Sequence, residues 1–508
     1  MQPDIFRFKW WALIGLCLLS FTAFLDFTIV NTALPFIQKH FHCSVIQLQW
    51  VTNIFCMLTS MFMIAAGRCG DMWGRRKVFY FGFIAFAVAA IGAATANSIE
   101  WLIFFRGLQG FAAAIIFTIS VSLIPHTFPE KQHNKAIGVY SAITGAGLAL
   151  GPLVGGILIS LFSWRAVFWV NIPIIIVGLI FCSFSLRETP KPIEKIRFDL
   201  KGLLLLIIGI GGVVYGIIHG EQYSWTLTST WYYLIAGILA FVLLFFIEPR
   251  IKHPMLELSI FKNKGAALAI IVCVTAGMVS YVLFFFDPLY LGIIRNEPAL
   301  IIGILLFTVP FVQVLLSTFL QTALKLSRGI TGLLLVGLST AVIASIGHLF
   351  VTNHLESLIF LLLAFIFMGM SWGIANAGSI VSINQSVEPQ RIGGTIGTVF
   401  TTWNIAGSVL LAIATAIFHS REQVSMKNEL AKHHILLTAN QHQQVSAALS
   451  DPAHGKAMIA QLTGTHVSGI EHAFSNAFLA GFHGMAWLVF GLSVSFLIAG
   501  LFIARKRT

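Results

Sequence analysis

The sequence predicts an all-α membrane protein in which fourteen helices cross the bilayer. Three observations support this prediction: 57% of the 508 residues are hydrophobic, only 10% are charged, and apolar runs recur between short polar breaks. Soluble globular proteins carry about 25% charged residues. Together with a mean hydropathy of +0.88, this composition excludes a cytosolic enzyme, a disordered chain and a secreted disulfide scaffold.

Each apolar run of about 20 residues is long enough to cross about 30 Å of hydrocarbon. The predicted spans lie at about 11–35, 47–66, 78–96, 101–125, 136–162, 166–186, 202–219, 230–247, 265–292, 299–323, 330–350, 357–384, 393–418 and 474–503.

An even number of spans places both termini on one side, and the Lys and Arg residues indicate which side. Of the 31, 23 fall in segments on the side of the termini and seven on the other, while Arg106 lies inside a span. Short cytoplasmic loops are enriched in these residues, so both termini are expected in the cytoplasm of a cell with this protein in its inner membrane. The net charge of +12 therefore needs no nucleic-acid partner.

Two polar links, at about 187–201 and 248–264, flank two of the spans and leave six spans on each side. This layout predicts an N-terminal six-helix bundle over residues 1–186, a linker with two extra helices over 187–264, and a C-terminal six-helix bundle over 265–508. The outer loop 419–472 belongs to the last unit and contains seven His residues. Their spacing fits no metal-ligand pattern, so a solvated helical cap is expected rather than a metal site.

A glycine-rich loop joins the second and third spans. It reads G-x-x-x-D-x-x-G-R-R and comprises Gly67, Asp71, Gly74, Arg75 and Arg76. The glycines permit a tight turn, and Asp71 can cap a neighbouring helix or pair with Arg75. The alternative is a basic cytoplasmic loop that happens to contain an Asp.

Arg106 is expected to face the interior of the bundle, because a charge in hydrocarbon needs a partner. It lies about 9 Å below the outer surface, which is deep for a side chain that snorkels. Asp26 lies about 8 Å below the same surface, so we predict that the two side chains pair. The competing interpretation of Asp26 is a structural carboxylate that caps a broken helix.

The fifth span contains the pattern G-x-x-x-G-P-x-x-G-G, formed by Gly147, Gly151, Pro152, Gly155 and Gly156. Small residues four apart let helices approach closely, and Pro152 removes a backbone hydrogen bond and bends the helix. The alternative is an ordinary packing face of small residues.

These segments resemble a known family. The loop 67–77 is similar to the one between the second and third helices of the major facilitator superfamily. Leu25–Pro35 resembles the first-helix signature of its fourteen-helix drug:proton antiporters, and Trp164–Pro173 resembles their W-R-x-x-F-x-x-N-x-P signature. Arg106–Gly110 resembles the R-x-x-Q-G motif associated with proton transfer. Gly147–Gly156 resembles the helix-five motif that marks exporters.

The resemblance implies the major facilitator fold and a proton-coupled antiporter that exports small amphipathic compounds by alternating access. The implied energy source is the proton gradient, with no cofactor, and no nucleotide-binding loop is present. Asp26 and Arg106 would couple the proton. Asp287, near the outer end of span nine, either titrates too or faces water at the rim. The candidates to line a substrate cavity, or else to form interhelical hydrogen bonds, are Asn31, Gln109, Trp372, Asn376 and Asn404.

Four alternatives remain at this stage, and one of them, a passive channel, would lack proton dependence. An exporter dedicated to one endogenous metabolite, such as a siderophore, would share all these features, and an uptake symporter would lack the Gly147–Gly156 motif. A membrane enzyme would need a cluster of catalytic side chains that the spans do not show, so no enzymatic activity is expected. Related exporters in double-membraned bacteria join a periplasmic adaptor and an outer-membrane channel, for which the loop 419–472 is the candidate docking surface.

Overall fold

The computed structural model describes residues 8–186, 188, 199–223, 225–250, 263–327, 329–352, 354, 356–387, 392–432, 445, 449 and 467–505. Helices are the regular secondary structure in this part of the chain, and 14 of them are long and apolar enough to cross a membrane. The prediction of an all-α membrane protein with fourteen spans is confirmed.

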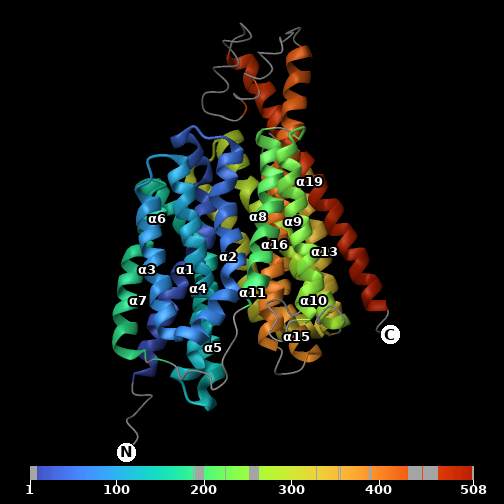
Figure 1. The fold of residues 1–508 in the computed structure, drawn as a ribbon. Coiled ribbons are helices and arrows are strands. Elements are labelled where there is room, and N and C mark those ends of the chain that lie inside the picture. Colours follow the sequence, from blue (N-terminus) through green and yellow to red (C-terminus); the bar gives the residue numbers. More distant parts are fainter. Residues whose placement is uncertain are drawn as a thin grey trace, which may run out of the picture.

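The first six spans form the N-terminal half (Figure 1). The sixth is interrupted at Val170, so that it comprises two helices. The elements are α1 (Lys9–Phe41), α2 (Val45–Trp73), α3 (Arg75–Ala94), α4 (Ile99–Thr127), η1 (Glu130–Gln132), α5 (His133–Leu161), α6 (Ala166–Trp169) and α7 (Asn171–Ser185).

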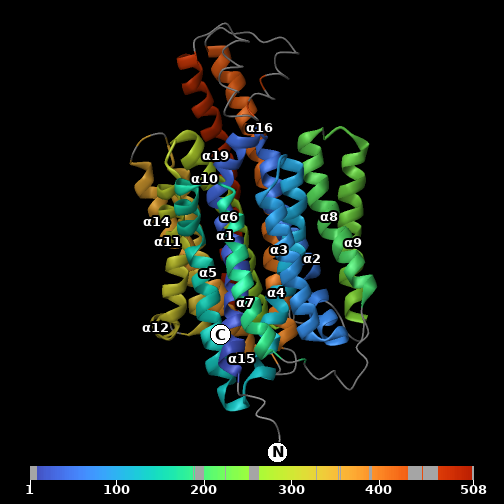
Figure 2. The ribbon, with the colours of Figure 1, turned by 90° about the vertical axis from the view of Figure 1, so that its left-hand side faces the viewer.

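The next two spans form a pair at one side of the molecule, as Figure 2 shows. They are α8 (Leu200–Gln222) and α9 (Thr228–Ile247), followed by η2 (Glu248–Arg250). Buried side chains of α8, such as Leu206 and Ile210, pack in one apolar cluster with Met61 of α2 and Ala412 of the C-terminal half. Helix α8 therefore packs against both halves of the protein.

The last six spans form the C-terminal half, in which one short π-helical segment ends the ninth span and another interrupts the twelfth. The elements are α10 (Lys264–Leu289), η4 (Tyr290–Ile294), α11 (Ala299–Thr318), α12 (Leu320–Leu326), α13 (Ile330–Leu349), α14 (Ser357–Gly373), η5 (Ile374–Gly378), α15 (Ser379–Ser386), α16 (Ile392–Lys432) and α19 (Val467–Arg505).

The two faces of the molecule are distinguished by the chain ends. Helix α1 begins and α19 ends at the same end, which we call the terminal face, and the other end is the opposite face (Figure 1). Helix α16 has 41 residues, or about 60 Å, which is twice the thickness of the hydrocarbon layer. It and α19 therefore extend beyond the opposite face, where Met426, Leu430 and Phe474 form a separate small core.

This extension changes the predicted boundaries of the outer loop. The prediction began the loop at 419 and ended it at 472, whereas α16 continues to Lys432 and α19 already begins at Val467. Of the seven His residues, His419 is a buried residue of α16 and His472 is exposed on α19. The other five lie outside the described residues. No group of three metal-ligating side chains occurs in the part of the chain that the structure describes.

The two halves share one backbone feature in front of their third membrane span. Gly74 precedes α3, the third helix of its half, with a φ of 101°, and Gly329 precedes α13, the third helix of the other half, with a φ of 107°. Side chains other than glycine rarely adopt this left-handed conformation. A glycine with positive φ thus precedes the third membrane span in both halves.

Candidate functional site

Asp26 and Arg106 form a salt bridge in the interior of the N-terminal half. Oδ2 of Asp26 on α1 lies 2.6 Å from an Nη atom of Arg106 on α4, and both side chains are almost completely buried. The matched depths estimated from the sequence therefore predicted the pair correctly. An ion pair in such a place is stable only when its other lone pairs and protons are also satisfied.

Two amides complete the coordination of the carboxylate. Nδ2 of Asn171, the first residue of α7, donates to Oδ1 of Asp26 at 2.9 Å, and Nε2 of Gln109 donates to the same oxygen at 3.3 Å. Oε1 of Gln109 in turn accepts from Arg106 at 2.9 Å. We call these four residues the Asp26 cluster. The sequence proposed Gln109 for a substrate cavity, and the structure places it, fully buried, inside this cluster.

Arg106 is held on its remaining sides by α2. Its Nε donates to the carbonyl oxygen of Val51 at 3.1 Å, and its guanidinium lies 4.3 Å from the ring centroid of Phe55. Phe168 lies on a further side at 6.0 Å. Because a cation and an aromatic face attract each other, these contacts stabilise the buried guanidinium. The Asp26 cluster thus joins α1, α4 and α7, and α2 packs against it.

The position of Asn171 along the sixth span places it at the depth of Asp26. The described chain turns at Trp164 and Arg165, whose guanidinium stacks on the Trp164 ring and donates to the carbonyl of Ala96 at 2.8 Å. Asn171 follows about 8 Å below this turn, at the depth of Asp26 and Arg106. Sequence reasoning missed this residue as a partner, although the same depth estimate would have found it.

The first and fifth spans meet next to this cluster, where Pro152 leaves a carbonyl group without a donor. A proline at position 152 cannot donate to the carbonyl of Leu148, four residues earlier in α5. Oγ1 of Thr28 on α1 donates to that carbonyl oxygen at 2.9 Å instead. Helix α1 thus makes two polar contacts in this region. Asp26 pairs with Arg106 of α4, and Thr28 donates to the Leu148 carbonyl of α5.

The glycines of α5 divide between two neighbours. Gly147, Gly151 and Gly155 lie four residues apart and face α1, and a side chain at Gly147 would come within 2.7 Å of the Phe21 carbonyl. Gly156 faces the other half, where a Cβ atom would lie 2.6 Å from the carbonyl oxygen of Ala299 on α11. The motif therefore lets α5 touch α1 within its own half and α11 across the boundary.

The segment 67–77, predicted as a loop, is helical on both sides of Gly74, and its side chains fasten α2 and α3 to α4 at the terminal face. Asp71 pairs with Arg75 at 2.8 Å, as one of the two sequence interpretations expected. An Nη atom of Arg75 donates to the carbonyl of Ser122 at 3.0 Å. Gly67 packs on Thr118 of α4, where a Cβ atom would lie 3.1 Å from its methyl group.

Glu188, just beyond α7, also contacts this segment, at the start of α3. Its carboxylate accepts from the backbone N–H of Arg76 at 3.0 Å, at the N-terminus of α3, where a negative charge is favoured by the helix dipole. The sequence analysis considered Asp71 for a capping role of this kind. Glu188 was missed, because nothing in the local pattern connects it with a helix so far back in the chain.

An aromatic seam connects the two halves beside the Asp26 cluster. The ring of Phe27 on α1 lies 6.2 Å from that of Phe55 and 6.0 Å from that of Tyr281 on α10. The Tyr281 hydroxyl donates to Oδ1 of Asn404 on α16. The ring of Trp372 lies 6.0 Å from that of Trp403, next to Asn404.

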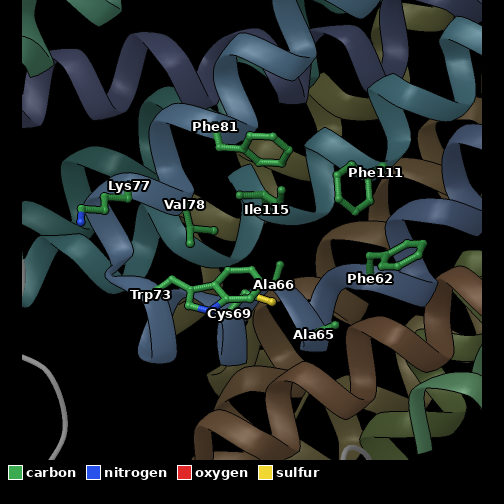
Figure 3. A pocket seen from close by; sticks show the side chains of 10 residues that line it. All are labelled: Phe62, Ala65, Ala66, Cys69, Trp73, Lys77, Val78, Phe81, Phe111 and Ile115. Carbon is green, nitrogen blue, oxygen red and sulfur yellow. The ribbon is translucent and has the colours of Figure 1, made fainter. Parts of the chain in front are cut away.

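The residues proposed for a substrate cavity are not gathered around one described hollow. Asn404 and Trp372 belong to this aromatic seam, Asn31 is buried in α1, and Asn376 is partly buried in η5. A cavity of about 330 Å³ lies instead between α2, α3 and α4 (Figure 3). It is lined mainly by apolar side chains, among them Phe62, Phe81 and Phe111.

A larger groove, of about 1170 Å³, lies between α8, α16 and α19. It is lined by Glu221, Trp225, Arg421 and Trp487 among others. Neither this groove nor the smaller cavity includes a residue of the Asp26 cluster.

Asp287 is fully buried rather than facing water at the rim. Its carboxylate contacts His348 of α13, whose Nε2 lies 3.2 Å from Oδ1 and 3.3 Å from Oδ2. Sequence reasoning named Asp287 but not its partner, because the rotation of α13 about its axis is set by packing.

Comparisons with known proteins agree with this architecture. The sequence model of the Major Facilitator Superfamily matches residues 16–411. The Multidrug resistance protein Stp of Mycobacterium tuberculosis is 33% identical over 291 residues, which is 56% of this chain and 53%, about half, of Stp. The Tetracenomycin C resistance and export protein of Streptomyces glaucescens is 26% identical over 92% of this chain and 86% of its own length.

A solved structure shows the same fold. The crystal structure of a bacterial homolog to the human lysosomal transporter Spinster, in an inward-facing and occupied conformation, superposes with a TM-score of 0.67 at 18% sequence identity. The superposition covers 98% of this chain and 97% of that one. The chain therefore belongs to the Major Facilitator Superfamily, a family of transporters with relatives named for multidrug resistance and export.

Proposed function

We propose that this protein is a proton-coupled antiporter that exports small amphipathic compounds across the cytoplasmic membrane. The observation that supports this most directly is the Asp26 cluster, a buried carboxylate paired with a buried guanidinium between four helices. Burial favours the neutral form of a carboxyl group and a neighbouring cation favours its charged form. In this proposal Asp26 is the carboxyl group that exchanges a proton in each transport cycle.

The cost of an unpaired buried charge links the proton to the conformation. When Asp26 takes up a proton, Arg106 keeps its charge without a counter-charge, at a cost of about 3–5 kcal/mol when one partner of such a pair is lost. A conformation in which water or cargo reaches Arg106 reduces that cost. Protonation therefore favours a rearrangement of the four helices that meet at the cluster, and release of the proton reverses it.

Alternating access would use the glycine contact between α5 and α11. The two halves touch closely where Gly156 meets the Ala299 carbonyl, and this contact has to loosen when the opposite face opens. The aromatic seam around Phe27, Tyr281 and Trp372 offers flat apolar faces and a few polar groups to a bulky cargo. The names of the relatives favour export over uptake.

We place the terminal face in the cytoplasm, because the Lys and Arg residues concentrate in the segments on that side. Each proton that moves inward then gains about 2.3 kcal/mol per 100 mV of membrane potential. The extension of α16 and α19 beyond the opposite face would stand outside the membrane. In a double-membraned bacterium it is the surface we propose for a periplasmic adaptor that leads to an outer-membrane channel.

The test uses inverted membrane vesicles, whose lumen corresponds to the outside of the cell. Acidifying the lumen should drive rhodamine 6G into it, and an uncoupler should abolish the uptake. Asp26→Asn keeps the size of the side chain and should lose proton-driven uptake, while Glu130→Gln, an exposed carboxylate at the terminal face, should retain it. Full activity of Asp26→Asn would refute the role of Asp26.

The same vesicles separate the alternatives. An uptake symporter would move its cargo out of the lumen with the protons, and a passive channel would ignore the uncoupler. If a panel of cationic and neutral dyes shows no proton-driven movement at equal protein content, the proposed export of amphipathic compounds is wrong. A dedicated metabolite exporter would then be tested with a panel of siderophores.

A further inference from the structure

A second buried pair of titratable groups lies in the C-terminal half. Asp287 on α10 and His348 on α13 are both fully buried, and Nε2 of His348 lies 3.2 and 3.3 Å from the two carboxylate oxygens. The proposed mechanism at Asp26 does not use this pair. It lies near the opposite face, because His348 is one residue before the end of α13 and Asp287 is two residues before the end of α10.

The hydrogen bonds determine how many protons the pair carries. Nδ1 of His348 lies 2.7 Å from the carbonyl oxygen of Ala344, which can only accept, so Nδ1 carries a hydrogen. The contact between Nε2 and the carboxyl group then needs one further hydrogen between them. It resides either on Nε2, facing a carboxylate, or on the carboxyl group, facing a neutral imidazole. Both forms contain the same single shared proton and have no net charge.

The groups around the pair have their own partners. The Tyr290 hydroxyl, next along the chain in η4, donates to the Thr352 carbonyl at 2.6 Å. From α19, Nε2 of His483 lies 2.7 Å from the Val351 carbonyl, and the Phe482 ring stacks on His348 at 6.2 Å. From α14, the ring of Phe365 lies against the His348 ring. From α16, the ring of Phe418 lies against the ring of Phe286, which precedes Asp287.

We propose that Asp287 and His348 form a second proton-binding site, which holds one exchangeable proton and gives it up when water reaches it from the opposite face. The transport role of this proton rests on the proposed function. The existence of a site that holds one proton is independent of it. Without the proton, an imidazole lone pair faces a carboxylate, and one negative charge is buried without compensation. Such a state favours separation of α10 and α13, which admits water.

The first experiment counts protons on the purified full-length protein in detergent. Between about pH 5.5 and about pH 9, the wild type should release one proton more than Asp287→Asn/His348→Gln, since the amide pair keeps a hydrogen bond but has no titrating proton. In an Asp26→Asn background, Asp287→Asn/His348→Gln should again lower the number of released protons by one. An equal release from the wild type and the double variant would overturn the proposal.

The second experiment asks whether this proton is transported. In proteoliposomes with an internal pH dye, the number of protons moved per rhodamine 6G should fall by about one in Asp287→Asn. A protein that merely lost packing would move fewer molecules at an unchanged ratio, and that result would overturn the transport role. If the wild type moves no dye under any acid gradient, the proposed function fails, and the proton count of the first experiment still decides whether the site exists.

Discussion

The hydrogen bond from Thr28 to the carbonyl of Leu148 exists because Pro152 has no N–H, and this dependence can be measured. We expect Thr28→Val, which keeps the shape of the side chain, to leave that buried carbonyl without a donor. The hydroxyl also lies 3.4 Å from the Leu25 carbonyl, but the 2.9 Å contact with Leu148 is the shorter one. An unsatisfied buried carbonyl costs about 1–3 kcal/mol in soluble proteins, and interhelical hydrogen bonds in membranes average about 0.6 kcal/mol.

We therefore expect Thr28→Val to lower the free energy of unfolding by about 1 kcal/mol. Pro152→Ala supplies an N–H group that can reach the Leu148 carbonyl through the helix itself. In that background Thr28→Val should cost close to nothing, so the two changes should be coupled by nearly the full effect. Equilibrium unfolding of the four proteins in mixed micelles measures the cycle, with Thr28→Ser as a variant that keeps the hydroxyl group. An equal cost of Thr28→Val in both backgrounds would refute the reasoning.

The remaining predictions concern the ion pair and the contact between the halves. Arg106→Ala should destabilise the purified protein by about 3–5 kcal/mol, because it leaves Asp26 buried without a counter-charge. Adding Asp26→Asn should restore part of that loss when both variants are unfolded at equilibrium in mixed micelles, and a further loss would contradict the prediction. Gly156→Val should push α11 away at Ala299, at a cost of about 1–3 kcal/mol to the conformation in which the halves touch. Dye transport should then fall tenfold or more, whereas Gly138→Val, at a position with open space, should transport normally, and equal transport by both would contradict the prediction.

Asp26 and Asp287 differ in how much of their surroundings could be predicted from the sequence. Asp26 and Arg106 could be paired in advance, because a helix rises by a constant 1.5 Å per residue and both positions can be counted from a membrane surface. The same count gave a depth for Asp287 but left open whether it titrates or faces water. His348 could not be identified as its partner, since counting along the chain does not tell which side of α13 faces α10.

The inserted helices and the outer segment show a similar limit. Hydropathy predicted α8 and α9 as spans, but the packing of α8 against α2 and α16 became visible only in the fold. Hydropathy also ended the thirteenth span at 418, where the apolar run stops. Helix α16 continues to Lys432 because it pairs with α19, and their contact buries Met426 and Phe474 beyond the apolar run.

The sequence by itself determined the class of the protein, its fourteen spans and the motifs at which its helices come close. These properties depend on the transfer of residues between water and hydrocarbon and on local backbone geometry, both of which can be read along the chain. The tertiary structure alone decided which polar groups meet: Asn171 with Asp26, Thr28 with Leu148, and His348 with Asp287. Such meetings depend on the rotation and tilt of each helix, and these follow from the packing of all its neighbours at once.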